Sequence, residues 1–398
     1  MKSIFATFIC LTMFNVAVAS DAVIWQQDLS CDSNSECRPG AMVVDSKNNE
    51  VTILGTSQRL NTREADFWSW TIDPNGSVTH KNSLGPVSQY NSLVMRSLGI
   101  RAIVNPNTSG IVRLTMDDVN SVSLSITGRN MQSRTSKLGI RQKRSETFLL
   151  HDMTSCQNDD LLFVGQENLN GILMKTDLTG NVLWKKLFHH GQTNILSSIA
   201  RIPDGKDYYV VGMSVSMAGK MTFAGPATVC VLRYDGNGEL KGSDFFEGGL
   251  APWPTSFPKV ICLPSGIVMV VYDKSRNGKE TELYLRAYTP ELELLYQKQI
   301  LKTKEEGPPA FFDICATNEN RFALAGVINY SDLRIYECDA DGTILQTVEL
   351  DGEIKVAGIR VYIDYLAGKI FVAFATRPQE NAKDVKIKLL ALKPYKTN

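Results

Sequence analysis

A four-residue turn, Asp-x-x-Gly, recurs along the chain and constrains its fold more than any other feature. The turns begin at Asp73, Asp177, Asp235 and Asp339, at intervals of 104, 58 and 104 residues. The two long intervals predict a degenerate turn halfway along each, and Ser125-Ile-Thr-Gly and Thr289-Pro-Glu-Leu stand there. One further interval reaches the end of the chain. A fixed period of this kind indicates a repeat architecture, here of seven units of about 50 residues.

Each unit contains four short runs of apolar, β-branched or aromatic residues separated by polar turns. In the third unit, residues 161–188 read LLFVGQENLNGILMKTDLTGNVLWKKLF and hold the last three runs. Such runs predict strands, and Asp, Asn and Gly supply the positive φ values that tight hairpins need. Four antiparallel strands in about 50 residues are typical of a β-propeller blade. We expect blades at 41–84, 91–130, 148–188, 195–246, 257–300, 309–350 and 354–394.

The two ends of the chain predict how the ring closes. The seventh unit stops after its third run, at residues 389–392, and a lone strand-like run, AVIWQQDL, occupies residues 22–29. This run matches the fourth run of the third unit, NVLWKKL, in its two aliphatic residues, its Trp and its two polar residues. An open ring would leave sheet edges exposed. We therefore expect an all-β, seven-bladed propeller in which the N-terminal strand completes the last blade.

The second unit is the least regular. After three recognisable runs comes a strongly basic stretch at residues 130–145 that lacks strand periodicity. A solvated connection between blades is the simplest interpretation, and a processing or anion-binding site is the alternative.

The N-terminus has the layout of an export signal. Lys2 precedes an apolar run at residues 4–14, and small residues stand at the cleavage positions in Ala17-Val18-Ala19. We expect residues 1–19 to be a cleaved signal peptide and residues 20–398 to be one propeller domain, secreted or periplasmic. No later segment approaches the roughly 20 apolar residues of a membrane span.

An oxidising compartment permits disulfides. Cys31 and Cys37 flank a polar DSNSE loop and are predicted to pair. The other cysteines lie in apolar runs, where a buried free thiol that behaves as a small hydrophobic side chain is the simpler expectation. They are Cys156, Cys230, Cys262, Cys315 and Cys338.

Composition excludes several functions. Lys and Arg total 42 and Asp and Glu total 42, so no net field favours nucleic acid. The 398 residues include four histidines and no G-x-S-x-G motif, so the sequence offers no nucleophile and base for acyl transfer. No cluster at metal-ligand spacing is present, and we expect neither a metal nor a cofactor.

Residues 176–184, TDLTGNVLW, resemble the D-x-x-TG-x-x-x-W tail of quinoprotein-type (PQQ-like) propeller repeats. The resemblance implies the propeller fold for the whole mature chain, although only the third unit carries the full motif. Quinoprotein enzymes would also have a vicinal disulfide and a calcium-ligand set in the channel, and the sequence contains neither.

In a propeller, the loops between second and third strands share one face with the blade-to-blade connections. Loops of variable length on a repeating scaffold are where binding usually occurs. His189 and His190 suit proton transfer or metal binding, but adjacent residues diverge, which favours ordinary loop histidines. Trp253, between two prolines, suits stacking on a sugar or anchoring a protein, or plugging the next blade. Arg59, Arg63 and Arg377 are expected around the channel mouth and favour an acidic ligand, or are solvated loop charges.

The sequence therefore favours an exported module that binds a protein or glycan partner through its loop-rich face. The alternative is a carbohydrate-acting enzyme with its site at the channel mouth, which would require two carboxylates to meet in the channel.

Overall fold

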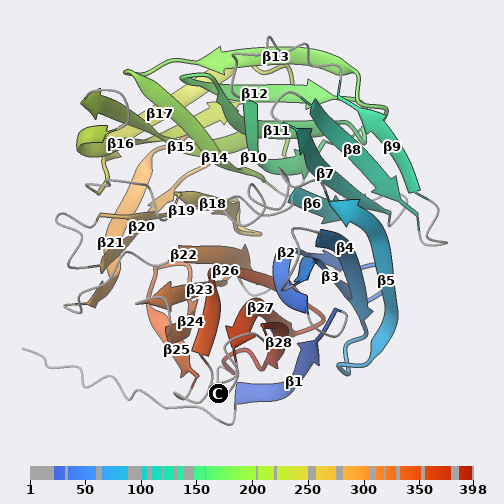
Figure 1. Ribbon diagram of the computed structural model, residues 1–398. Helices are drawn as coiled ribbons and strands as arrows, with labels where there is room; N and C mark the ends of the chain where they lie inside the picture. Colours follow the sequence, from blue (N-terminus) through green and yellow to red (C-terminus); the bar gives the residue numbers. More distant parts are fainter. Residues whose placement is uncertain are drawn as a thin grey trace, which may run out of the picture.

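The computed structural model confirms the predicted architecture. It describes residues 22–31, 35–59, 65–87, 101–104, 110–118, 121–128, 133–138, 148–156, 158–202, 205–218, 222–249, 257–274, 281–303, 311–317, 320–328, 332–350, 355–377 and 385–396. Seven four-stranded antiparallel sheets form a ring, with one strand of each at the centre and one at the rim (Figure 1). The protein is a seven-bladed β-propeller, numbered here from blade 1 (β2 to β5) to blade 7 (β26 to β28 and β1).

The strands fall into four sets by their place in the blade. The inner strands are β2 (Ser35–Asp45), β6 (Arg101–Val104), β10 (Phe148–Ser155), β14 (Thr193–Arg201), β18 (Lys259–Cys262), β22 (Phe311–Ala316) and β26 (Lys355–Leu366). The second strands are β3 (Glu50–Arg59), β7 (Ile111–Asp118), β11 (Leu161–Glu167), β15 (Tyr208–Ala218), β19 (Val268–Asp273), β23 (Phe322–Ile328) and β27 (Lys369–Arg377). The third strands are β4 (Ala65–Ile72), β8 (Ser121–Thr127), β12 (Asn170–Thr176), β16 (Thr222–Tyr234), β20 (Thr281–Tyr288), β24 (Asp332–Cys338) and β28 (Lys386–Leu392). The outer strands are β5 (Val78–Val87), β9 (Ser133–Lys137), β13 (Val182–Phe188), β17 (Leu240–Glu247), β21 (Leu294–Thr303), β25 (Ile344–Glu349) and β1 (Val23–Leu29).

Burial explains why the strands differ in sequence. Leu161 to Gly165 in β11 are all buried, because a middle strand packs against a neighbouring blade on both faces. In the outer strand β13, half-buried and exposed residues alternate, because one face of the strand meets solvent. The continuous apolar runs of the sequence are therefore middle strands, and the mixed runs are outer strands.

The Asp of each Asp-x-x-Gly turn closes the turn with its own carboxylate. Asp177 Oδ1 accepts hydrogen bonds from the backbone N–H groups of Thr179 (2.8 Å) and Asn181 (2.9 Å). Gly180 has φ of 89°, which an L side chain rarely adopts. The side-chain hydroxyl of Thr179 and the bonds from Asn181 lower the pKa of Asp177 to about 2. Asp73, Asp235 and Asp339 accept the same pair of backbone hydrogen bonds in their own turns.

An aromatic ring from each of several outer strands covers the turn glycine of the next blade. A Cβ placed on Gly238 of blade 4 would lie 2.8 Å from the ring of Trp184 on β13. A Cβ on Gly76 of blade 1 would lie 2.8 Å from the ring of Trp25 on β1, whose indole N–H donates to Pro74 O (3.1 Å). The Gly and the Trp of the repeat are therefore partners across a blade boundary.

The boundary between blades 4 and 5 reverses this arrangement. On β17, Gly242 occupies the position that Trp184 has on β13. The turn of blade 5 ends in Leu292, at φ of 68°, where other turns have Gly. The Leu292 side chain lies 3.6 Å from a Cβ built on Gly242. A large turn residue thus fills the space that a missing ring leaves.

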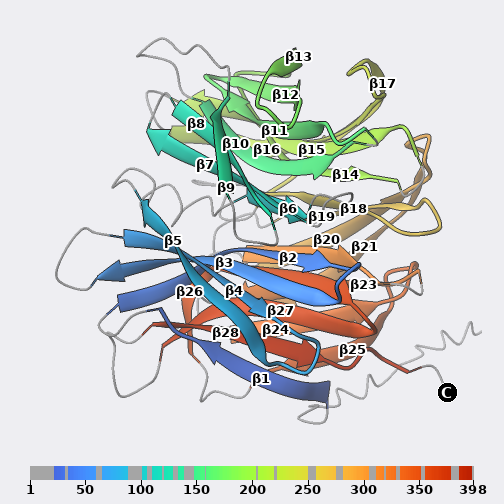
Figure 2. The same cartoon turned by 90° about the vertical axis from the view of Figure 1, so that its right-hand side faces the viewer.

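The ring closes as the sequence predicts. β1 pairs antiparallel with β28, from Trp25 opposite Ala391 to Leu29 opposite Ile387, and the blue β1 lies at the edge of the red blade 7 in Figures 1 and 2. The predicted disulfide is present: Cys31, after β1, is bonded to Cys37 on β2, with a Cα–Cα distance of 5.9 Å. It joins the closing strand to blade 1. The five other cysteines described are free and buried, as expected.

Blade 2 differs from its prediction. Residues 133–137, within the basic stretch expected to be a connection, form the outer strand β9, paired with β8. The stretch SRTSK has no apolar residue to mark it as a strand, and its pairing with β8 decides its conformation. The predicted signal peptide, residues 1–19, lies outside the described residues. None of the described elements is a helix long and apolar enough to cross a membrane.

We predict that Trp184→Ala lowers the free energy of unfolding by about 3 kcal/mol, because it removes a ring that packs into the next blade. Leu183→Ala is the matched control, since Leu183 is the adjacent residue and is 51% exposed. It should change stability by less than about 0.5 kcal/mol. Urea unfolding followed by tryptophan-independent circular dichroism measures both. Equal effects of the two variants would contradict this role of Trp184.

Candidate functional site

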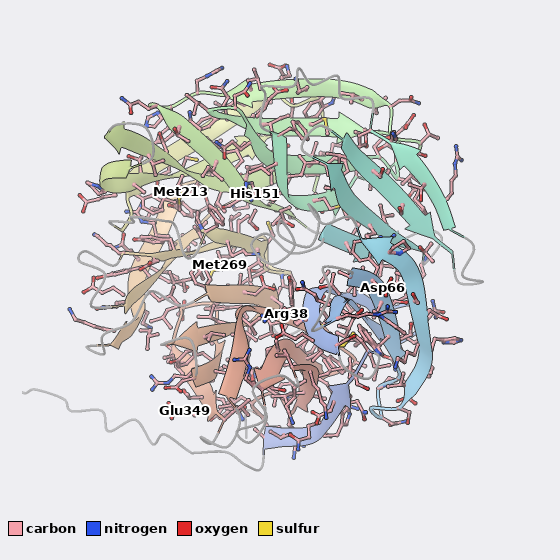
Figure 3. The ribbon with its side chains drawn as sticks, in the orientation of Figure 1. Arg38, Asp66, His151, Met213, Met269 and Glu349 are labelled. Carbon is pink, nitrogen blue, oxygen red and sulfur yellow. A yellow bond between two sulfur atoms is a disulfide. The ribbon has the colours of Figure 1, made fainter. Side chains whose placement is uncertain are left out.

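A channel cavity of about 330 Å³ lies at the centre of the ring and is bounded by residues from all seven inner strands. Figure 3 shows Arg38 on β2 and His151 on β10 toward the centre and Glu349 on β25 at the rim. The polar residues of the cavity come from blades 3 to 7, whereas blades 1 and 2 contribute Ala41, Met42 and Ala102. The wall of the channel is therefore polar on the side of blades 3 to 7 and apolar on the side of blades 1 and 2.

The polar channel residues occupy one structural position. Each is paired with a second-strand residue that faces the next blade, and in blade 1 the same position holds Ala41. The polar residues at this position are Asp152, Ser198, Lys259, Asp313 and Tyr362.

Each of these side chains reaches the inner strand of the following blade. Asp152 accepts from Ser198 Oγ (2.9 Å) and from the N–H of Ile199 (3.1 Å). Tyr362 donates its hydroxyl to Gly40 O (2.6 Å), across the junction of the last and first blades. The channel side chains thus link neighbouring blades.

Asp313 lines the channel, and its charge acts on the carboxyl group of Asp364 on β26. Asp313 forms an ion pair with Lys259 (3.2 Å) and accepts from the N–H of Ile363 (3.3 Å). Asp364 lies two residues beyond Tyr362 on β26, so both side chains point to the same side of the strand. Burial, with a contribution from the charge of Asp313, raises the pKa of Asp364 to about 7. Asp364 can therefore keep its proton up to near neutral pH.

Bulges in the inner strands set which residues enter the channel. The register shifts between Leu150 and Asp152 in blade 3, and between Leu196 and Ser198 in blade 4. The extra residues are buried and contact other blades: Ser197 Oγ donates to Pro258 O (2.7 Å), and the ring of His151 lies 5.1 Å from that of Phe257. Simple alternation along these strands therefore fails at the channel.

The predicted histidines lie in the connection between blades 3 and 4, and both are exposed. The ring of His190 stacks on Phe245 of β17 at 4.2 Å between centroids and on Phe188 of β13 at 6.4 Å. The rings of Phe188, His190 and Phe245 are nearly parallel and form one cluster between the two outer strands, and Phe245 is 37% exposed. We call these three residues the aromatic stack.

The backbone around His190 is held firmly. Its N–H donates to the buried Asn194 Oδ1 (2.9 Å), and its carbonyl accepts from Ser214 Oγ. Asn194 also donates through its backbone N–H (2.8 Å) and its side chain (3.2 Å) to Leu169 O, in the turn between β11 and β12. The stack is therefore presented on a fixed backbone.

The other predicted site residues lie elsewhere. Arg59 ends β3 and Arg377 ends β27, so both stand on the face of the second-to-third strand loops, in the neighbouring blades 1 and 7. The structure does not bring them to the histidines, which belong to the junction of blades 3 and 4. Arg63 and Trp253 lie outside the described residues. Within the described part of the chain, no group of three or more His, Cys, Asp or Glu side chains could hold a metal ion.

The sequence contained a weak signal for the channel residues that loop-based reasoning missed. Asp152, Asp313 and Asp364 interrupt the apolar runs FLLHDMTS, FFDICA and VYIDYL. In Asp152 and Asp313, a charged residue inside an otherwise apolar first run marks the position that faces the channel, and Asp364 lies two residues beyond that position.

No protein-family model matches the sequence, and no curated protein matches it. Solved structures share the fold at low identity. The polysaccharide lyase Uly1 has a TM-score of 0.53 at 10% identity, over 89% of this chain and 89% of that chain. Drosophila Plexin A, solved in complex with Semaphorin 1b, has a TM-score of 0.54 at 7% identity, over 93% and 87%. This likeness shows the propeller fold alone, which serves both binding proteins and enzymes.

We predict that Asp364 makes stability depend on pH. Its pKa of about 7 in the folded protein lies above the ordinary 3.8, so the folded state holds the proton more tightly. This contribution to stability is present at low pH and is lost as the pH rises from about 4 to about 7. Asp364→Asn cannot ionise, and it keeps an acceptor for the N–H of Tyr365.

The free energy of unfolding of the variant, relative to that of the wild type, should therefore increase with pH, by on the order of 2–4 kcal/mol at pH 8. Urea unfolding of both proteins between pH 4 and pH 8 measures the difference, in which all other titrating groups cancel. A difference that stays constant over this range would show that Asp364 does not titrate there.

Proposed function

We propose that the protein is an exported binding module that holds a protein or glycan partner through its loop-rich face. The observation that carries the proposal is the aromatic stack, a set of three rings at the surface where blades 3 and 4 meet. Exposed aromatic side chains of this kind supply most of the affinity of many binding surfaces, for sugars and for proteins.

The fixed backbone under the stack supports the proposal. Binding costs conformational entropy when side chains must be immobilised, and a surface that is already ordered avoids part of that cost. The bonds from Asn194 and Ser214 hold the connection before any partner arrives. Leu169 is 55% exposed in the adjacent turn, on the same face, and extends the apolar surface beside the stack.

The test is a direct capture experiment with purified protein. Wild-type protein, His190→Ala/Phe245→Ala and Leu294→Ala are immobilised, and each is exposed to envelope extract or medium of the source organism and to a glycan array. Leu294 is the matched control, because it is 49% exposed on the outer strand of blade 5, away from the stack. We expect the wild type and the control to retain the same partner.

The double variant should bind this partner at least about 30-fold more weakly, as the loss of a binding hot spot of 2 kcal/mol or more requires. Equal binding by all three proteins would show that the binding site does not include the aromatic stack. A wild type that retains neither a protein nor a glycan would reject the binding role.

The channel carboxyl groups favour a second candidate, a carbohydrate-acting enzyme. Glycoside-cleaving sites commonly use one protonated and one ionised carboxyl group. Asp364, with its raised pKa, suits the acid, and Asp313, in an ion pair with Lys259, would be the second carboxyl group. Against this role, the bonds of Asp313 to Lys259 and to Ile363 already occupy its two oxygens.

The enzyme candidate predicts that the wild type cleaves a glycan and that Asp364→Asn lowers the rate by about 10²- to 10⁴-fold. Release of new sugar ends from a glycan panel, with Asp152→Asn as the channel control, measures it. The absence of cleavage by the wild type, or an equal rate in Asp364→Asn, would rule this candidate out.

A further inference from the structure

The turn between β4 and β5 in blade 1 carries a tripeptide that the equivalent turns of the other blades lack. Residues 73–77 read DPNGS, so that Asn75, Gly76 and Ser77 form an Asn-x-Ser sequence. Asn-x-Ser/Thr, where x is not Pro, is the acceptor for N-linked glycans in exported proteins. Two further copies of the tripeptide begin at Asn107 and Asn329, which lie outside the described residues. The structure therefore describes the surroundings of the acceptor at Asn75.

The turn is held by its backbone and by Asp73, without the side chains of Asn75 and Ser77. Asp73 Oδ1 accepts hydrogen bonds from the N–H groups of Asn75 (2.9 Å) and Ser77 (2.9 Å). The Asp73 N–H donates to Ser77 O (3.0 Å), and the Gly76 N–H donates to Asp73 O (3.1 Å). Asn75 and Ser77 are exposed, and neither side chain is hydrogen-bonded to any residue that the structure describes. The amide and the hydroxyl group of the acceptor are therefore not needed by the fold.

The equivalent turn of blade 3 uses these positions for its own structure. Asn181, which corresponds to Ser77, donates through its side chain to Asp177 Oδ2 (2.8 Å) and to Thr179 Oγ1 (2.7 Å). The side chains at the two positions are thus engaged with the turn in blade 3 and open to solvent in blade 1.

The two neighbours of Asn75 are held against blade 7. Pro74 O accepts from the indole N–H of Trp25 (3.1 Å) and from Lys369 Nζ. A Cβ on Gly76 would lie 2.8 Å from the Trp25 ring. This boundary is closed, whereas the boundary of blade 1 with blade 2 contains a cavity of about 360 Å³. Asn75 is therefore the exposed tip of a firmly held turn, where a bulky group can project into solvent.

The turn lies on the face opposite the aromatic stack. It joins a third strand to an outer strand, whereas His190 belongs to a blade-to-blade connection at the other end of the strands. A glycan on Asn75 would therefore leave the proposed binding face free.

We propose that Asn75 carries an N-linked glycan. The donor is a lipid-linked oligosaccharide diphosphate, and the transferase is that of the export pathway. A bond forms between Asn75 Nδ2 and C1 of the first sugar, and the bond from C1 to the phosphate oxygen breaks. The lipid diphosphate leaves, and the amide nitrogen loses one proton. The inference rests on the export that the N-terminus predicts, and it does not depend on the partner of the aromatic stack.

The experiment is mass spectrometry of tryptic peptides from the chain as the source organism makes it. Cleavage after Arg63 and Lys81 gives a peptide, residues 64–81, in which Asn75 is the sole asparagine. We expect this peptide to carry the mass of an oligosaccharide. Peptide N-glycosidase should remove the oligosaccharide and convert Asn75 to Asp.

Variants produced in the same organism test the acceptor sequence. Asn75→Gln and Ser77→Ala should each lose this glycan completely, and Ser77→Thr should keep it because the hydroxyl group remains. Thr79→Ala is the matched control, since Thr79 is an exposed hydroxyl residue outside the acceptor sequence. It should be glycosylated as the wild type is.

The turn of blade 4 provides a second test, because it lacks only the hydroxyl group. Asn237 is exposed, and its turn has the same pair of N–H bonds to Asp235 Oδ1 (2.9 and 3.0 Å). Glu239 stands in the place of Ser77, and its ion pair with Lys186 is at the surface, so its replacement should leave the fold intact. Asn237 should be unmodified in the wild type, and Glu239→Ser should add a glycan to it.

An unmodified Asn75 in a chain that starts at Ser20 would overturn the proposal and leave the predicted export in place. A chain that keeps residues 1–19 and carries no glycan would overturn both. A glycan on Asn237 in Glu239→Ser, beside a bare Asn75, would show that the export pathway modifies such turns but not the turn of blade 1. Loss of the glycan in Thr79→Ala would contradict the role of the acceptor sequence.

Discussion

The contact between an outer-strand aromatic ring and the turn glycine of the next blade holds neighbouring blades together at three boundaries, through Trp25, Trp184 and Tyr296. It explains why Asp-x-x-Gly and Trp recur together, since the Gly of one repeat makes room for the Trp of the previous one. At the boundary of blades 4 and 5, Gly242 and Leu292 exchange these roles, with the small residue on the outer strand and the large one in the turn. The recurring Gly and aromatic residues therefore reflect contacts between neighbouring blades more than the structure within one blade.

The sequence was sufficient for the fold because turns and apolar runs are local signals. It predicted the seven blades, the closing strand and the bond between Cys31 and Cys37, each of which depends on neighbouring residues or on a simple period. It did not predict the channel. One extra residue in β10 and in β14 changes which side chains face inward, and a bulge leaves no mark in an alternation pattern. Phe245, the ring that stacks on His190, is likewise far along the chain, so no local pattern joins the two.

The boundaries of blade 1 are unequal, and this inequality permits an open cavity. On the side of blade 7, Trp25, the disulfide and the bond from Tyr362 to Gly40 hold blade 1 in place. On the side of blade 2, Thr52, Ser69 and His80 replace the aliphatic and aromatic residues of other blades. Because blade 1 is held firmly to blade 7, its boundary with blade 2 can contain a cavity while the propeller stays closed.

The closure of blade 7 has a consequence for how the protein is made. β1 is synthesised before the six blades that separate it from its partner β28, so the sheet that joins them cannot form until β28 has been made. Until then, the edge of β1 is an unpaired strand that can join other chains. The strand that closes the ring therefore stays without its partner throughout the synthesis of the blades between them.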